Sequence, residues 1–287
     1  LFSTGYMANL GVISALLGRG DSLYEDRLNH ASLVDAGLLC RARLKRYQHG
    51  DSQSLERQLE GVAWGERLIA TDGVFSMDGD LAPLPEIVDL AREHGALVVV
   101  DDAHATGVIG AGRGTAQHFE LPEQVDLCMG TFGKALGSFG AFVACPGPIR
   151  ELLVNRARSL VYTTAPPPAV AGAALAALEV IQDQPRLLQT LRERSHQLRS
   201  GLRALGHPVP DNPSPIVPLV LGENRRTLEW SRELWQAGFW VHPIRPPTVP
   251  EGTARLRITV TAAHTREDVE ALLAAVSRLT GPDEAPP

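Results

Sequence analysis

Cysteine is scarce in this sequence. The chain has 287 residues and three cysteines, Cys40, Cys128 and Cys145. None of them forms a CxxC pair, and an odd, sparse set of cysteines is not typical of a disulfide framework. We therefore expect a reducing compartment, the cytoplasm, and we predict no metal site.

Long apolar runs and a large excess of charge of one sign are also missing. No stretch reaches the roughly 18 apolar residues that a membrane helix needs, and no charged segment followed by an apolar one opens the chain. The net charge is −6, with both signs interspersed along the sequence, which argues against a nucleic-acid surface. We expect no nucleic-acid partner and no membrane partner.

An initiator methionine is missing as well. The first residues, LFSTGYMANLGVISALL, run from an apolar pair directly into a helical pattern. We interpret this start as lying inside a domain, and we expect that an N-terminal segment is lacking.

Short β-rich runs alternate with helical patterns over the first half of the chain. Strands are predicted at 22–26, 44–48, 67–71, 96–101, 125–129 and 140–144, and helices at 6–17, 30–40, 53–60 and 84–94. Three long helices follow from about 149, and then strands at 216–221, 239–244 and 255–260 and a helix from about 265. This order predicts an α/β fold, with a large domain over 1–182 built on a mostly parallel sheet and a smaller α+β domain over 183–287.

Polar residues follow one of the predicted strands directly. In VVVDDAHATGVIG, residues 98–110, three valines predict a strand that is buried on both faces. Ligands of open α/β sheets bind outside the carboxyl ends of the strands. Asp101, Asp102 and His104 therefore lie where a site is expected, although Asp102 could equally orient its neighbours or cap the next turn.

A lysine among glycines follows a second predicted strand. In MGTFGKALGSFG, the glycines allow close approach of the backbone to a ligand, and partial burial of Lys134 would lower its pKa and suit it to Schiff-base chemistry. Alone, Lys134 could equally be a solvated loop residue. Together with Asp101 and His104 it matches the needs of pyridoxal phosphate, because a buried carboxylate requires a cation and the protonated pyridine ring is one.

The chain resembles the α-oxoamine synthase family of fold-type I pyridoxal phosphate enzymes over nearly its whole length. The matching stretches are STGYMANLG, DRLNHASLVDA, TDGVFSMDGDLAPL, VVVDDAHATGVIG, GTFGKALGSFG, YTTAPPP and IRPPTVPEGTARLRITVTAAHT. The last stretch resembles the branch that makes 8-amino-7-oxononanoate in biotin biosynthesis. The resemblance implies a three-layer αβα large domain with a smaller C-terminal α+β domain.

The resemblance also assigns roles to residues. It implies that Lys134 bonds the cofactor and later removes the substrate α-proton, that Asp101 pairs with the pyridine nitrogen, and that His104 bonds the phenolic oxygen. His30 would stack on the ring and help to align the substrate. Cofactor contacts are further implied for Gly5, Tyr6, Ser76, Thr131 and Thr164, the last of which would reach the phosphate of a neighbouring subunit in a homodimer with shared active sites.

For the substrate, the resemblance implies that Arg257 binds the amino-acid carboxylate and that Thr248 is a further contact. Arg255 remains a rival because side chains two apart on a strand point the same way, and Arg245 is a candidate for the far carboxylate of the acyl chain. The implied reaction condenses L-alanine with a pimeloyl thioester, carried by acyl carrier protein or coenzyme A, and releases CO2.

Two alternatives remain at this stage. The chain could be another α-oxoamine synthase, such as one resembling glycine C-acetyltransferase, or a non-catalytic fragment that binds pyridoxal phosphate. A dehydrogenase of the Rossmann type is disfavoured because no GxGxxG follows an early strand.

Overall fold

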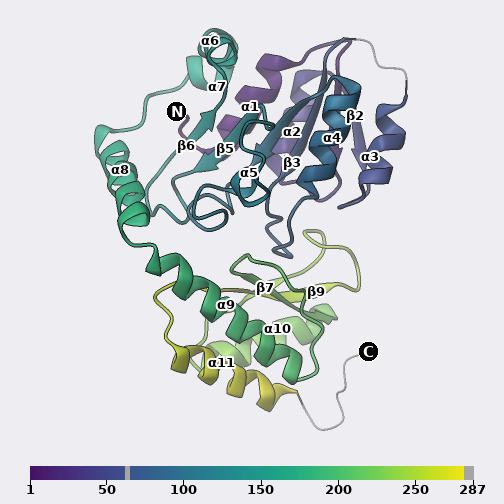
Figure 1. Cartoon of the computed structure of the whole chain (residues 1–287). Coiled ribbons are helices and arrows are strands. Elements are labelled where there is room, and N and C mark those ends of the chain that lie inside the picture. Colours follow the sequence, from purple (N-terminus) through teal and green to yellow (C-terminus); the bar gives the residue numbers. More distant parts are fainter. Residues whose placement is uncertain (62–64, 281–287) are drawn as a thin grey trace. The chain divides into compact units, whose positions relative to one another are not determined.

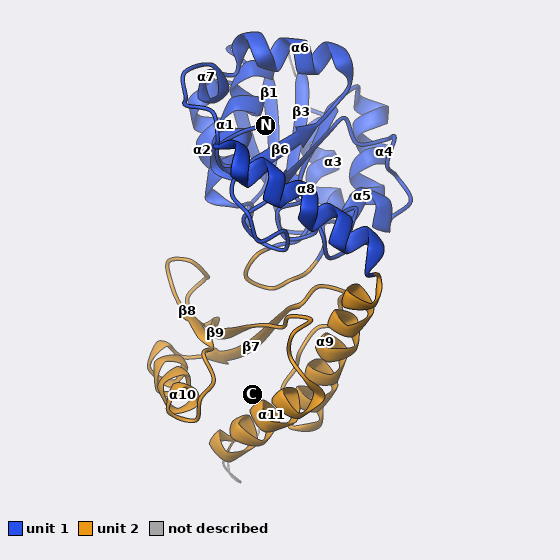
Figure 2. Cartoon of the chain, turned by 90° about the vertical axis from the view of Figure 1, so that its left-hand side faces the viewer, with its two compact units in different colours: residues 1–75, 81–184 blue, residues 76–80, 185–287 orange. Residues whose placement is uncertain are grey.

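The computed structural model of the chain describes residues 1–61 and 65–280 (Figure 1). The chain forms two compact units (Figure 2), of which the first contains Leu1–Phe75 and Leu81–Gln184. The second contains Pro185–Pro287 together with the short segment Ser76–Asp80. The predicted limits, 1–182 and 183–287, assumed that each domain is one continuous segment. In the structure, the short segment Ser76–Asp80 from the first half of the chain belongs to the second unit.

The first unit is built on a sheet of six strands in the order β2-β1-β3-β4-β5-β6. Five strands are parallel, and β6 pairs with β5 in the antiparallel sense. The strands are β1 (Ser22–Asp26), β2 (Arg43–Tyr47), β3 (Arg67–Asp72), β4 (Leu97–Asp101), β5 (Leu127–Thr131) and β6 (Ala141–Ala144). Strand β4 ends at Asp101 and β5 ends at Thr131, so the residues that follow them share one edge of the sheet.

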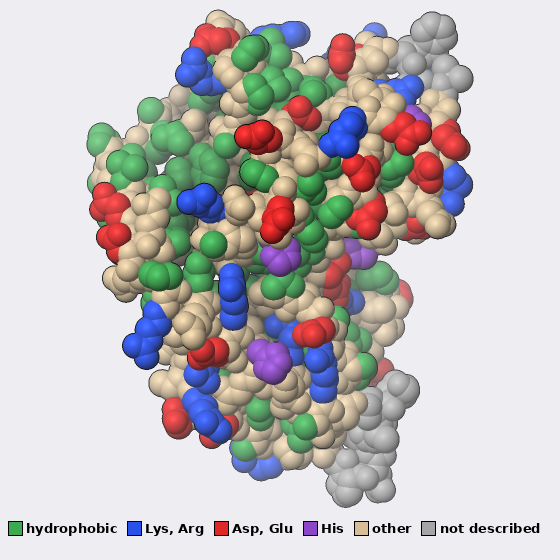
Figure 3. Space-filling model, in the orientation of Figure 1, with side chains coloured by type: hydrophobic (Ala, Val, Ile, Leu, Met, Phe, Trp, Pro, Cys, Tyr) green, Lys and Arg blue, Asp and Glu red, His purple; other side chains and the backbone are tan. Residues whose placement is uncertain are grey.

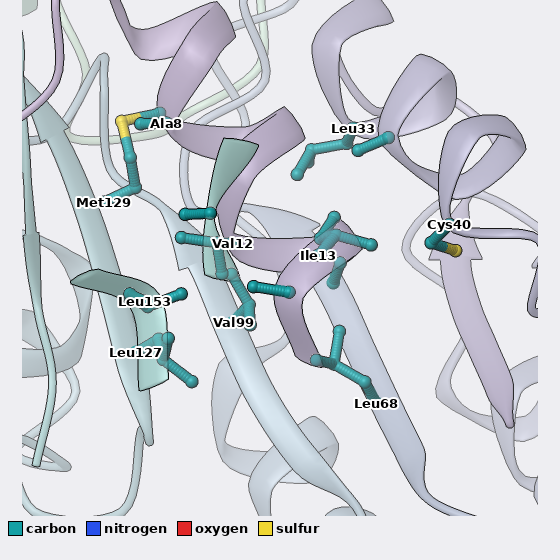
Figure 4. Packing of buried hydrophobic residues seen from close by; sticks show 14 of the residues in the cluster. Ala8, Val12, Ile13, Leu33, Cys40, Leu68, Val99, Leu127, Met129 and Leu153 are labelled. Atoms are coloured by element: carbon teal, nitrogen blue, oxygen red, sulfur yellow. The ribbon is translucent and has the colours of Figure 1, made fainter. Parts of the chain in front are cut away.

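Helices cover both faces of this sheet because both faces are apolar. On β4, Val99 packs into one core with side chains of α1 and α2, while Val98 and Val100 pack into a second core with side chains of α3 and α4. Figure 4 shows the first of these cores. The helices are α1 (Gly5–Leu16), α2 (Ala31–Cys40), α3 (Ser52–Leu59), α4 (Leu84–His94), α5 (Thr115–His118), α6 (Gly147–Arg156), α7 (Arg158–Val161) and α8 (Pro168–Asp183). The predicted three-layer αβα domain with a mostly parallel sheet is confirmed.

The second unit has a small antiparallel sheet in the order β7-β9-β8. Its core joins alternate residues of the strands, such as Leu256 and Ile258, to apolar side chains of three helices. The elements are α9 (Arg186–Ala204), β7 (Ile216–Gly222), α10 (Asn224–Gln236), β8 (His242–Ile244), β9 (Ala254–Thr259) and α11 (Arg266–Leu279). This is the smaller α+β unit that the sequence predicts.

Two local expectations differ from the structure. Helix α10 was not predicted, although Thr227, Trp230 and Leu234 are its buried residues and recur at helical spacing. The first of the three long helices predicted from about 149 is interrupted at Ala157, where the backbone is extended and separates α6 from α7.

The surface carries charges of both signs, interspersed over the face seen in Figure 3. Over residues 1–61 and 65–280, the structure has no helix that combines the length and apolar character needed to cross a membrane.

Candidate active site

A cavity of 190 Å³ lies in the first unit at the carboxyl ends of β4 and β5. The starts of helices α1 and α2 close it from the side, since Gly5 is the first residue of α1 and His30 is the N-cap of α2. Its lining is Gly5, Tyr6, His30, Ser32, Asp72, Asp101, Ala103, His104, Met129, Thr131 and Lys134. A larger hollow of 360 Å³ in the second unit has none of the predicted site residues in its lining.

Asp101 is the last residue of β4, and its side chain is 3% exposed. One carboxylate oxygen accepts a hydrogen bond from Nδ2 of Asn9 at 2.7 Å, and the other accepts from the backbone N–H of Ala103 at 2.9 Å. Burial raises the pKa of Asp101, and these two hydrogen bonds partly oppose that rise. A carboxylate so placed in a cavity wall is suited to a cationic partner.

The neighbouring Asp102 has a different environment. Its carboxylate accepts hydrogen bonds from the backbone N–H and the hydroxyl of Thr115, at 2.9 and 2.5 Å, and it does not line the cavity. Gly114, with φ of 99°, lies so close to this carboxylate that a Cβ at that position would meet it. The Asp102 carboxylate therefore binds the start of α5 at Thr115, and a role in orienting its neighbours stays a prediction.

Lys134 and His104 come together at the cavity although they lie on separate loops. The Lys134 amine is 2.9 Å from Nε2 of His104. Thr131, three residues before Lys134 and the last residue of β5, donates a hydrogen bond from its hydroxyl to the carbonyl of Gly140 at 3.0 Å. The loop that carries the lysine is thus fixed at both of its ends.

His30 and Tyr6 form a second side of the cavity. Nδ1 of His30 accepts a hydrogen bond from the backbone N–H of Ser32 at 3.2 Å, as the N-cap of α2. The Tyr6 ring meets the His30 ring edge-on, with centroids 6.3 Å apart, and its hydroxyl donates to the Asp35 carboxylate. Helix α1 begins at Gly5 and therefore directs backbone N–H groups and the positive end of its dipole to the cavity.

Asp72 lines the cavity but was not predicted from the sequence. It ends β3, pairs in register with Asp101 on β4, and is 4% exposed. Its carboxylate accepts a hydrogen bond from the backbone N–H of His30 at 2.6 Å. Burial raises the pKa of Asp72 well above its usual range, and the nearby Asp101 adds to that rise. The sequence could have predicted Asp72, because the strand RLIATD ends in an acidic residue in the same way as LVVVD, which ends in Asp101.

The structure therefore brings together Gly5, Tyr6, His30, Asp101, His104, Thr131 and Lys134 in one cavity. Ser76, Thr248 and Arg257 belong to the second unit, and Thr164 is an exposed residue after α7. The roles predicted for all of these residues stay predictions.

Among the arginines of β9, Arg255 and Arg257 have different surroundings. Arg255 is 6% exposed, forms an ion pair with Asp78 and donates from Nε to the carbonyl of Thr253 at 2.9 Å. Arg257 is half-buried, and its Nε is buried without a hydrogen-bond partner in the described part of the chain. Burial lowers the pKa of Arg257. Arg257 is therefore the arginine of this strand with unused hydrogen-bonding capacity.

Comparison with known proteins agrees with this geometry. Residues 1–276 match the family described as aminotransferase class I and II, and the chain belongs to this family. It is 55% identical to the 8-amino-7-oxononanoate synthase of Methylococcus capsulatus over 279 residues, which are 96% of this chain and 72% of that protein. It is 52% identical to the 8-amino-7-oxononanoate synthase of Trichlorobacter lovleyi, covering 97% of this chain and 72% of that protein. Within the class, the chain thus falls in the 8-amino-7-oxononanoate synthase family.

Solved structures agree as well. Serine palmitoyltransferase from S. paucimobilis, determined with a bound PLP-myriocin aldimine, matches with a TM-score of 0.93 and 33% identity, over 97% of this chain and 71% of that one. The 8-amino-7-oxononanoate synthase from Francisella tularensis matches with a TM-score of 0.85 and 29% identity, over 96% of this chain and 80% of that one. The family predicted from the sequence is confirmed, and so is pyridoxal phosphate as its cofactor.

Proposed function

We propose that the chain condenses L-alanine with a pimeloyl thioester to give 8-amino-7-oxononanoate, CO2 and the free thiol carrier. The observation that carries the proposal is the cavity of the first unit, in which a lysine amine, a buried aspartate and two histidines converge. The relatives that share about half of this sequence bear the name of that activity.

The residues of the cavity fit pyridoxal 5'-phosphate. The buried Asp101 offers a carboxylate to a cationic pyridine nitrogen, and His104 lies where it can bond a phenolic oxygen. The backbone N–H groups of Gly5 and Tyr6 at the start of α1, with the Thr131 hydroxyl, suit a phosphate. His30 is suited to pack on a ring face. When bound, the cofactor supplies an electron sink that stabilises negative charge on the substrate α-carbon.

Lys134 has two tasks in this proposal. Its amine would hold the cofactor while no substrate is present, and it would be free once L-alanine is bound. The freed amine removes the proton from the alanine α-carbon, as a base within reach of the substrate. His104, 2.9 Å away, keeps the amine directed into the cavity.

Bond making and breaking then balance with one proton taken up from water. The α-carbon of alanine forms a bond with the thioester carbonyl carbon, and the C–S bond breaks to release a thiolate, which takes that proton and leaves as the thiol. The bond from the α-carbon to its carboxylate carbon breaks next and releases CO2. A proton returned to the α-carbon completes the product, and Lys134 is the nearest described amine that can deliver it.

The second unit supplies the substrate contacts in this proposal. Arg257 binds the alanine carboxylate through its guanidinium fork, since Arg255 is already paired with Asp78. Thr248 is a further substrate contact, and Arg245, which is exposed, is available for the far carboxylate of the acyl chain. Ser76 contacts the cofactor from the segment that packs with this unit.

The assembly and the compartment are also proposals. Thr164, exposed beyond α7, reaches the phosphate of a second copy, which gives a homodimer with shared active sites. The acyl carrier is acyl carrier protein or coenzyme A, and the reducing cytoplasm is the compartment in which three unpaired cysteines persist.

The experiment is a product assay on the full chain loaded with pyridoxal phosphate. L-Alanine is supplied with pimeloyl-coenzyme A or with pimeloyl-acyl carrier protein, and mass spectrometry detects 8-amino-7-oxononanoate. We expect product from alanine in preference to glycine and serine. Turnover of glycine with acetyl-coenzyme A, or of serine with a long-chain acyl thioester, would assign another α-oxoamine synthase activity. Cofactor binding without any product would indicate a fragment that only binds the cofactor.

A further inference from the structure

Asn9 forms a contact in the cavity wall that the mechanism above does not use. It lies on helix α1 and is 1% exposed. Its Nδ2 donates to the Asp101 carboxylate at 2.7 Å and to the Ser32 hydroxyl at 2.8 Å. An amide nitrogen carries two hydrogens in fixed directions, so both donors of this side chain are committed.

The charge on Asp101 sets the orientation of the Asn9 amide. If the amide were reversed, its carbonyl oxygen would face the carboxylate, and two acceptors would meet without a proton between them. In the observed orientation, Oδ1 of Asn9 is buried and has no hydrogen-bond partner among the described residues. An unpaired buried oxygen is destabilising, whereas an apolar side chain of similar size would fill this space without that cost.

Ser32 extends the contact to His30, which also lines the cavity. Its hydroxyl lies 2.8 Å from Nδ1 of His30, and its backbone N–H also donates to Nδ1. Both bonds are satisfied when Nδ1 is unprotonated, which puts the proton of the neutral ring on Nε2. The backbone N–H of His30 in turn donates to Asp72. Asn9 therefore links the end of β4 to the start of α2.

We propose that Asn9 is a positioning residue of the cofactor site, which aligns the Asp101 carboxylate with the pyridine nitrogen and ties it, through Ser32, to the His30 ring. The inference rests on the proposed function only in taking Asp101 as the partner of the cofactor. The charged or titratable groups around Asp101 are Asp72, Asp102, Cys128, His30 and Lys134. Asn9 is the side chain whose amide bonds the Asp101 carboxylate directly.

The test uses the full chain and two spectroscopic readouts, the dissociation constant for pyridoxal phosphate and the pH midpoint of the visible absorbance of the bound cofactor. Asn9→Ala removes both donors, and we expect cofactor binding to weaken on the order of 10-fold, the effect of one hydrogen bond to a charged group. We also expect the pH midpoint to move. Ser14→Ala is the control, because the Ser14 hydroxyl bonds the Leu10 carbonyl on the same helix and Ser14 does not line the cavity.

A second pair of variants keeps the test decisive if Asn9→Ala does not fold. Ser32→Ala removes the hydroxyl that joins Asn9 to His30, whereas Ser32→Thr keeps a hydroxyl at the same place. We expect Ser32→Ala to change the pH midpoint in the same direction as Asn9→Ala, and Ser32→Thr to stay close to the wild type.

Wild-type values for both readouts in Asn9→Ala and Ser32→Ala, with only the unfolding temperature lowered, would overturn the proposal and assign Asn9 to packing. A wild-type chain that binds the cofactor but makes no product would contradict the proposed function and leave the Asn9 comparison intact. A wild-type chain that binds no cofactor would overturn both.

Discussion

The Lys134 amine lies 2.9 Å from Nε2 of His104, although 30 residues separate them in the sequence. The two residues follow β5 and β4, which are adjacent and parallel, so both loops leave the sheet at the same edge. This relationship places an amine beside an imidazole in a cavity that also holds a buried carboxylate.

Replacement of Lys134 by alanine is expected to abolish turnover, with a loss of at least about 10³-fold in kcat, because both the cofactor bond and the base are removed. The sequence contains one other lysine, Lys45, whose amine donates to the carbonyl of Gln58 and which does not line the cavity. Lys45→Ala is the matched control and is expected to retain kcat. Measured product formation for both variants decides, and equal activities would contradict the role of Lys134.

Asp101→Asn is expected to keep the fold and to lower kcat by about 10²-fold or more, since a neutral amide cannot hold the proton on a pyridine nitrogen. Asp102→Asn, one residue further, is expected to lower the unfolding temperature with a smaller effect on kcat, because Asp102 bonds Thr115 and does not line the cavity. Product assays and thermal unfolding of both variants test this contrast. A larger loss of kcat in Asp102→Asn would reverse the assignment.

Arg257→Gln is expected to raise the KM for alanine by about 10-fold to 100-fold, as expected for the loss of a charge-assisted bidentate contact, with little change in unfolding temperature. Asp78→Asn removes the ion-pair partner of Arg255 within the second unit. That variant is expected to lower the unfolding temperature, because it leaves a buried guanidinium without its partner. If Asp78→Asn and Arg257→Gln affected the same parameter equally, the two arginines would not have separate roles.

Glu25 gives the fold a predicted dependence on pH. Its side chain is fully buried on β1, and neither carboxylate oxygen has a hydrogen-bond partner among the described residues. Burial raises its pKa from 4.5 to about 7, partly opposed by Arg46. Between pH 4.5 and about 7, Glu25 is ionised in the unfolded chain but still protonated in the folded chain. The free energy of unfolding therefore falls as the pH rises through this range, by about 3 kcal/mol for this group.

Glu25→Gln removes this titration. When the pH is raised from 5 to 8, the unfolding free energy of the wild type is expected to fall relative to that of the variant. Urea unfolding of the cofactor-free chain at both pH values measures it. Glu86→Gln, at an exposed position of α4, is the control and should leave the pH dependence unchanged. A parallel pH dependence in wild type and Glu25→Gln would show that Glu25 is not the group responsible.

Much of the fold and part of the site followed from the sequence because they rest on local patterns. The alternation of strands and helices predicted the αβα layers. The end of VVVDD and the loop of Lys134 each follow a predicted strand, which indicated that their polar residues lie at the same edge of the sheet. Helix α10 was missed because few apolar positions interrupt its polar surface, although Trp230 and Leu234 are buried.

The remaining details depend on contacts between distant residues. Sequence spacing put Arg255 and Arg257 on the same strand face, and only the ion pair with Asp78, 177 positions away from Arg255, separates them. Asn9 contacts Asp101, which is 92 positions away in the sequence. The helical pattern of α1 does not indicate that this polar side chain is buried or which residue it bonds. The partner of the Asp102 carboxylate, Thr115, likewise lies 13 positions away in the sequence.

The most direct measurement of the central claim is borohydride reduction of the chain loaded with pyridoxal phosphate, followed by peptide mapping by mass spectrometry. Reduction fixes the cofactor to whichever amine has condensed with its aldehyde. Because the sequence contains only Lys45 and Lys134, the answer is unambiguous between side chains. We expect the cofactor on Lys134 alone, and we expect prior addition of L-alanine to reduce that labelling. Labelling of Lys45, or equal labelling of both lysines, would contradict the central claim.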